Sequence, residues 1–283
     1  MAEADPALRT PPWLRRTLIA AAVGVMGLLV VLPLVMVLTA AFGKGFAAWW
    51  AALSTPDAIS ALKLTLLTAT IVIPVNAVFG VFAAWSLTRF EFPGKRALLA
   101  LIDLPFAVSP VVAGLCLVLL FGAQGWFADL LRAWDVRILF ARPGIVLATL
   151  FITFPFVVRE LVPLMQQQGS EEEVVARSLG ASAWTMFFRV TLPNIKWGLL
   201  YGVLLCGARA MGEFGAVSVV SGHIRGLTNT MPLHIEILYN EFDSTAAFAV
   251  SSLLAGLALV TLVLKLWLEA RHGDGLARSH RRH

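Results

Sequence analysis

Six long apolar stretches divide this sequence, and each one is long enough to cross a lipid bilayer as a helix. They cover residues 18–41, 64–87, 97–121, 144–165, 197–220 and 246–267. A helix needs about 20 mainly apolar residues to span the hydrocarbon core. With 59% hydrophobic residues and a mean hydropathy of +0.82, the chain carries more apolar surface than a water-soluble domain of 283 residues can bury. The sequence therefore predicts an all-α integral membrane protein with about six transmembrane helices.

The basic residues between these stretches fall mainly on one side of the membrane. Thirteen belong to that side: Arg9, Arg15, Arg16, Arg89, Lys95, Arg96, Arg177, Arg189, Lys196, Arg271, Arg278, Arg281 and Arg282. The other side has five: Lys44, Arg132, Arg137, Arg142 and Arg225. Because short cytoplasmic segments carry an excess of Lys and Arg, we expect a cytoplasmic tail at 1–16, a membrane domain at 17–268 and a basic cytoplasmic tail at 269–283. The net charge of +5 is then explained by the excess of basic residues in the predicted cytoplasmic segments of a membrane protein. It implies no nucleic-acid partner.

The most polar part of the predicted membrane domain is a cytoplasmic loop at 169–196. Ser170 and Glu173 have the spacing of a capping box, in which each side chain bonds to the other's backbone N–H. The three acids at 171–173 would lie at the positive end of the helix dipole. Gly180 is placed to end this first helix in a left-handed conformation.

A second short helix is predicted directly after Gly180. Ser182 can cap it, and Pro193 is expected to end it. The helix carries three large rings, Trp184, Phe187 and Phe188, which would form an exposed aromatic knob. This favours a hairpin that inserts into a soluble partner; the alternative is an ordinary amphipathic surface helix.

Ionisable and small polar residues also occur inside the predicted spans. Arg209 and Glu213 are four residues apart, so they would share one helix face. Either Arg209 faces a translocation path, or the two form a structural ion pair, which is the common outcome and the favoured interpretation. Three serines near predicted helix breaks, Ser109, Ser218 and Ser221, could contact an oxyanion or pack helices closely. Asp103 is predicted near the membrane end of its helix.

Patterns typical of enzymes do not occur. The sequence has no G-x-x-x-x-G-K-[ST], H-E-x-x-H, C-x-x-C or G-x-S-x-G. Cys116 and Cys206 lie in predicted spans and are interpreted as packing residues. We therefore expect no catalytic residues, no metal site and no cofactor in this chain, and any ATPase must be a separate subunit.

The loop resembles the cytoplasmic coupling loop of ABC importer permeases, whose pattern is E-A-A-x-x-x-G-x(9)-I-x-L-P. The aligned residues are Val174, Val175, Ala176, Gly180, Val190, Thr191, Leu192 and Pro193. Gly180 and Leu192-Pro193 stand at the family spacing. Valines replace the Glu and the first Ala, and the nearest acid, Glu173, is one residue early. Which acid replaces the family's Glu stays open.

Residues 161–265 resemble the W-type permease subunit of bacterial sulfate/thiosulfate importers. The resemblance rests on SLGASAWTMFFRVTLPNIKWGLLYGV, ARAMGEFGAVSVVSGHIRG and, earlier, LPFAVSPVVAGL. It implies a bacterial inner-membrane location, a T-type second permease, two copies of an ATPase that bind ATP and Mg, and a sulfate-binding protein. The RAxGEFGA part also resembles molybdate permeases, so a molybdate/tungstate importer is an alternative. An ATPase-independent anion transporter or channel is a further one.

Overall fold

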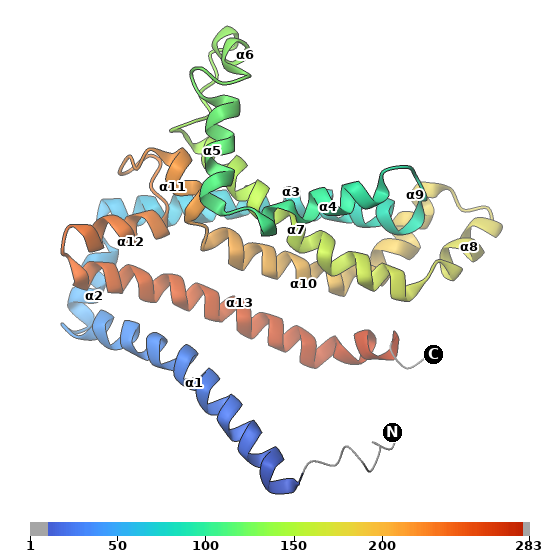
Figure 1. The fold of residues 1–283 in the computed structure, drawn as a ribbon, viewed down its shortest axis with the longest axis horizontal. Helices are drawn as coiled ribbons and strands as arrows, with labels where there is room; N and C mark the ends of the chain where they lie inside the picture. Colours follow the sequence, from blue (N-terminus) through green and yellow to red (C-terminus); the bar gives the residue numbers. More distant parts are fainter. Residues whose placement is uncertain (1–10, 280–283) are drawn as a thin grey trace.

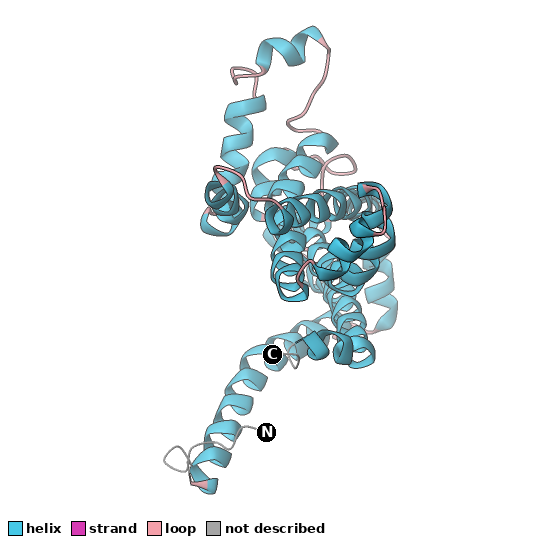
Figure 2. Cartoon of the chain, turned by 90° about the vertical axis from the view of Figure 1, so that its right-hand side faces the viewer, coloured by secondary structure: helices cyan, strands magenta, loops and turns pink. Residues whose placement is uncertain are grey.

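Four helices of the computed structural model, which describes residues 11–279, are long and apolar enough to cross a membrane by themselves. These are α1 (Pro12–Phe42), α3 (Pro56–Arg89), α7 (Arg142–Gln168) and α13 (Ser244–Ser279) (Figure 1). The shorter helices are α2 (Phe46–Leu53), α4 (Lys95–Ala107), α5 (Pro110–Phe121), α6 (Ala128–Ala133), α8 (Glu171–Ser178), α9 (Ala183–Met186), α10 (Leu192–Met211), α11 (Gly215–Ser221) and α12 (Met231–Asn240), and a π-helical turn covers Phe187–Thr191. Residues 11–279 contain no strand (Figure 2), so the predicted all-α class is confirmed.

Two of the six predicted spans are each formed by a bent pair of helices. The span predicted at 97–121 is α4 followed by α5, bent by 110°, and the one at 197–220 ends as α10 followed by α11, bent by 51°. Pro110 explains the first break, because the residue before a proline avoids the helical region, and Ser109 is extended with ψ at 136°. The membrane domain therefore has four spans, or up to six if each bent pair is one span.

The core that positions the loop at 169–196 is formed by α3, α7 and α10. Its buried members include Val72, Val157, Leu161, Met165 and Ile195. A Cβ added to Gly80 of α3 would lie only 2.5 Å from Val157 Cγ1 of α7, so the two helices approach as closely as a glycine allows. This close packing makes α3 and α7 a rigid base for the loop at their ends.

The first and last long helices run along the outside of this core. α1 contacts α13 and α2, and none of its most apolar stretch is buried. In Figure 1 the C-terminal end of α13 lies toward α8 and α9, whereas α2 and α12 lie at the opposite end. α1 begins at Pro12 and α13 continues to Ser279, so helix covers much of the predicted tails. Arg9, Arg281 and Arg282 lie outside the described residues.

Candidate functional site

The hairpin loop, residues 169–196, contains the two helix boundaries that the sequence predicts at Gly180 and Ser182. α8 ends at Ser178, and Gly180 has a φ of +87°, the left-handed region that favours glycine. The Ser182 hydroxyl accepts a hydrogen bond from the Thr185 N–H at 3.3 Å and so caps α9. Both predictions are confirmed, and the chain reverses between α8 and α9.

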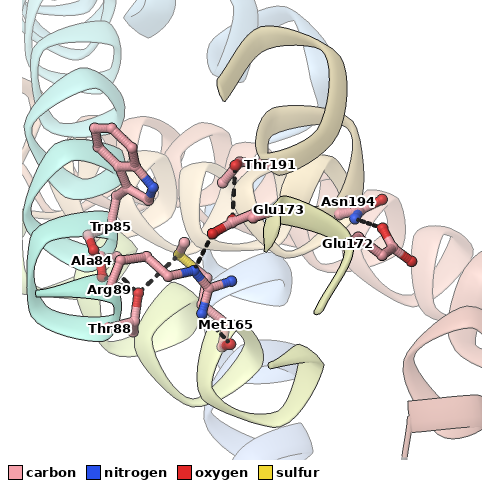
Figure 3. Close-up of polar contacts among 9 residues, drawn as sticks. All are labelled: Ala84, Trp85, Thr88, Arg89, Met165, Glu172, Glu173, Thr191 and Asn194. Atoms are coloured by element: carbon pink, nitrogen blue, oxygen red, sulfur yellow. Dashed lines mark hydrogen bonds and ion pairs between the residues drawn. The ribbon is translucent and has the colours of Figure 1, made fainter. Parts of the chain in front are cut away.

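The predicted capping box between Ser170 and Glu173 is not formed, although Ser170 does precede α8. The Ser170 side chain makes no capping hydrogen bond. The Glu173 carboxylate turns instead into the protein, where Oε2 lies 2.7 Å from Arg89 Nε and Oε1 accepts from the Thr191 hydroxyl at 2.8 Å (Figure 3). A guanidinium satisfies a buried carboxylate far better than a solvent-exposed backbone N–H would, so the ion pair replaces the box.

Arg89 joins the hairpin loop to two membrane helices. It lies in the last turn of α3, and its Nη1 donates to the Met165 carbonyl of α7 at 3.1 Å. The Arg89 and Glu173 side chains are 12% and 10% exposed. Because Thr191 also binds Glu173, one buried carboxylate connects α8 to α3 and to the π-helical turn (Figure 3). We call Arg89, Glu173 and Thr191 the brace.

A second contact ties α8 to the start of α10. Asn194 donates from Nδ2 to Glu172 Oε2 at 2.5 Å (Figure 3), and its carbonyl accepts from Gln168 at 3.1 Å. These groups are exposed, so they add less to stability than the brace does.

The predicted aromatic knob contains two of its three rings. Trp184 and Phe188 are 65% and 57% exposed, and they stack with centroids 5.9 Å apart. Phe187 is only 5% exposed and packs on Trp85 and Phe82 of α3, which corrects its assignment to the knob. Phe187 and Phe188 are consecutive residues of the π-helical turn, so their rings point in different directions, and that of Phe187 faces α3.

Exposed apolar residues from α8 extend this surface. Val174, Val175 and Leu179 are exposed, as are Trp184 and Phe188; we call these five residues the apolar cap, and Ala176, between them, is half-buried. The two valines that stand where the family pattern has Glu and Ala therefore face outward, while the nearest acid, Glu173, faces inward. Exposed apolar patches of this kind are typical of surfaces that contact another protein, a membrane or a ligand.

Pro193 does not end the helical segment, which corrects a further prediction. Leu192 and Pro193 lie in the first turn of α10, and the preceding Thr191 already has helical dihedral angles. The π-helical turn connects α9 directly to α10, so the hairpin's second arm continues into a membrane helix. A displacement of the apolar cap would be carried into α10 without an intervening loop.

Arg209 and Glu213 form the predicted ion pair, but not on one continuous helix. Arg209 Nη2 lies 2.7 Å from Glu213 Oε2, whereas α10 ends at Met211 between them. Glu213 Oε1 accepts from the Ala216 N–H at 3.0 Å, so the buried carboxylate also caps α11. The pair holds the break between α10 and α11 together, which agrees with the structural interpretation.

The three serines that were candidates for oxyanion contact lie around these breaks. Ser109 is exposed before α5. Ser218 donates its hydroxyl to the Gly215 carbonyl at 2.9 Å, and buried Ser221 accepts from the His223 N–H at 3.2 Å. The hydroxyls of Ser218 and Ser221 thus serve local backbone bonds.

Sequence reasoning missed Arg89, Thr191 and Asn194 as parts of this site. Arg89 is a basic residue at the end of a predicted span, a pattern that indicates topology and names no partner. The two ends of the ion pair are 84 residues apart, and only the packing of α3 on α7 brings them together. Within residues 11–279 no three His, Cys, Asp or Glu side chains are grouped as metal ligands would be.

Comparison with known proteins gives the relatives of this chain. It is 52% identical over 89% of its length to the protein named sulfate permease 2, chloroplastic, of Chlamydomonas reinhardtii, of which 69% is covered. It is 51% identical over 90% of its length to the sulfate transport system permease protein CysW of Synechocystis sp. strain PCC 6803, of which 93% is covered.

A solved structure has the same fold. A chain of a bacterial alginate ABC transporter superposes with a TM-score of 0.74 over 92% of this chain and 94% of that one, at 16% identity. The model of the family described as binding-protein-dependent transport system inner membrane component matches residues 76–273, which include α7, the hairpin loop and α10. This chain therefore belongs to the family of binding-protein-dependent transport system inner membrane components.

Proposed function

We propose that this chain is the W-type permease subunit of an ATP-driven sulfate/thiosulfate importer. The observation that carries the proposal is the hairpin loop: an exposed apolar cap fixed by a buried brace to the ends of two membrane helices. The substrate class rests on relatives about half identical over nine tenths of the chain whose names specify sulfate.

In this proposal the chain itself hydrolyses nothing. It has no phosphate-binding motif, so ATP and Mg are bound by two copies of a separate cytoplasmic ATPase, which dock on the apolar cap and on its counterpart. That counterpart belongs to a T-type permease, and a sulfate-binding protein delivers the anion from the other side. In this proposal both termini and the hairpin loop lie in the cytoplasm, an orientation supported by the excess of basic residues on that side.

A molybdate or tungstate importer is the second candidate. It is favoured by the string RAMGEFGA at 209–216, which holds the Arg209–Glu213 pair. A transporter or channel without an ATPase would leave the apolar cap without a partner, so it is the less favoured alternative.

Uptake by the reconstituted complex tests the substrate. The chain, its T-type partner, the ATPase and the binding protein are placed in proteoliposomes with ATP, and uptake of radioactive sulfate is measured with unlabelled competitors. We expect thiosulfate to compete and molybdate or tungstate at equal concentration to have little effect. Transport of molybdate with no transport of sulfate would overturn the assignment.

A further inference from the structure

An ion pair outside the hairpin loop joins α4 to α7. Arg159 Nε donates to Asp103 Oδ1 at 2.8 Å, and the guanidinium carbon lies 4.4 Å above the centre of the Phe106 ring. This is the only hydrogen bond that Arg159 makes within residues 11–279, so the two terminal nitrogens of the guanidinium hold no acceptor there.

Both charges lie inside stretches that the sequence predicts to span the membrane. Arg159 is nine residues before the end of α7 and Asp103 eight after the start of α4; at 1.5 Å per residue, each is about 12–14 Å inside the end of its helix. Each is also six residues, about 9 Å, inside the end of its predicted span, 97–121 for Asp103 and 144–165 for Arg159.

The pair is nevertheless open to the outside of this chain. The Arg159 and Asp103 side chains are 55% and 49% exposed, and between residues 144 and 165 of α7 the exposed residues are Arg159 and Pro163. Ionisable side chains within a membrane span usually face other protein or a water-filled cavity and not lipid. α1 gives a comparison, because its exposed surface is the one suited to lipid. The exposed residues of α1 between 18 and 41 are apolar except for Thr39.

Arg159 and Arg209 each pair with a carboxylate, but the two carboxylates differ in burial and in their other hydrogen bonds. The carboxylate beside Arg209 is 1% exposed and also caps α11, so that pair is built into the fold. The carboxylate beside Arg159 is half-exposed and has no other hydrogen bond within residues 11–279. A guanidinium with its fork free can bind an oxyanion through two parallel hydrogen bonds.

We propose that the face around Asp103 and Arg159 lines a water-filled route between this chain and the second permease, and that Arg159 contacts a tetrahedral oxyanion passing along it. Asp103 is a positioning residue: it holds the guanidinium at membrane depth when no anion is present and keeps its terminal nitrogens directed to the route. The inference rests on the proposed function for the identity of the anion, but not for the presence of water.

Accessibility to a charged thiol reagent tests the route. Asp103→Cys is made in the assembled transporter with Cys116→Ala and Cys206→Ala, beside Val30→Cys on the exposed side of α1 as the control. A membrane-impermeant anionic methanethiosulfonate reacts only with thiols in water. We expect it to modify Asp103→Cys in at least one of the ATP-free and ATP-bound states, to be slowed by sulfate, and to leave Val30→Cys unmodified.

Uptake completes the test. Per assembled complex, Arg159→Gln should reduce sulfate uptake about tenfold or more, whereas Arg159→Lys, which keeps the charge but loses the fork, should retain part of it. No modification of Asp103→Cys in either state, with sulfate uptake by the parent transporter intact, would show that protein covers this face and would overturn the inference alone. Modification without sulfate transport by the parent would instead overturn the proposed substrate.

Discussion

At the scale of single residues, Glu173 determines how the hairpin loop is attached to the membrane domain. Its carboxylate is buried and accepts from Arg89 and from Thr191. A buried charge is stable only while its partners remain, because removing one of them leaves the other charge desolvated and unpaired. The loop is therefore attached to the last turn of α3 and to the C-terminal end of α7.

Replacing Glu173 by Gln should destabilise the loop strongly. Arg89 would keep its charge in a site about one-tenth exposed, which costs roughly 3 kcal/mol by comparison with other buried pairs. Thermal unfolding of the solubilised complex measures this. Glu171→Gln, in the same turn but exposed, is the matched control and should change little; equal midpoints for the two variants would contradict the brace.

Arg209 and Glu213 should depend on each other. Arg209→Ala leaves a buried, unpaired carboxylate and should reduce the amount of folded protein, and adding Glu213→Ala should restore part of it. Because Glu213 also caps α11, the rescue should be incomplete. Sulfate uptake per folded protein decides the role: normal uptake by the double variant agrees with a structural pair, and a well-folded but inactive double variant would make Arg209 a pathway residue.

Features that depend on a few neighbouring residues could be predicted from the sequence, and those that depend on tertiary contacts could not. Gly180 and Ser182 were predictable, because a left-handed helix end and a helix N-cap each favour particular residue types over a few positions. The direction of Glu173 was not, because it depends on Arg89, which only tertiary packing brings near. Arg159 was missed for the same reason.

At the scale of elements, the apolar cap is a surface formed by α8 and the residue after it, by α9 and by the π-helical turn. The sequence shows three aromatic residues but not which side of the helix α3 covers. Phe187 faces α3 and belongs to the core, while Trp184 and Phe188 face away. Two kinds of aromatic substitution should therefore give different defects.

Trp184→Ala and Phe188→Ala should weaken co-purification with the ATPase while the membrane domain stays folded, since both rings are exposed in this chain. Phe187→Ala should instead lower stability by about 3–5 kcal/mol, as expected for truncating a buried aromatic ring. Pull-down and thermal unfolding on the same preparations separate the effects. Undiminished ATPase binding and uptake in both Trp184→Ala and Phe188→Ala would remove the apolar cap from the docking surface.

Gly180 tests the turn between α8 and α9. A Cβ there would meet no atom within 4 Å, so a substitution is limited by the backbone φ of +87° alone. Val should cost about 1–2 kcal/mol and uncouple ATP hydrolysis from uptake, whereas Asn, which tolerates this conformation, should be much milder. Equal coupling in Gly180→Val and Gly180→Asn would show that the turn does not need a left-handed residue.

The positions of the membrane spans could be predicted from the lengths of the apolar stretches, but the breaks within two of them could not. The apolar stretches continue past Ser109-Pro110 and past Gly212–Gly215, where Glu213 is the one charged residue. A mean hydropathy over about 20 residues meets the length criterion whether or not the helix is continuous. The bends of 110° and 51° come from backbone restrictions at proline and from the capping of α11 by Glu213. Such breaks are tolerated in a membrane only where protein or water satisfies the freed backbone groups.

At the scale of the whole molecule, the chain has three distinct surfaces. α1 presents an apolar side suited to lipid, the face of α4 and α7 presents a half-exposed ion pair, and the hairpin loop presents the apolar cap. The brace and the uninterrupted path from α9 through the π-helical turn to α10 connect the cap to the membrane core. This arrangement suits a subunit that receives force from an ATPase and changes an opening elsewhere.

Sulfate uptake with and without a working ATPase tests the central claim most directly. Proteoliposomes hold this chain, the T-type permease, the binding protein and either the active ATPase, a hydrolysis-deficient variant of it, or none. The account predicts ATP-dependent accumulation of sulfate with the active ATPase and none in the other two preparations. Equal sulfate movement in all three would contradict it and identify a channel or a transporter that needs no ATPase.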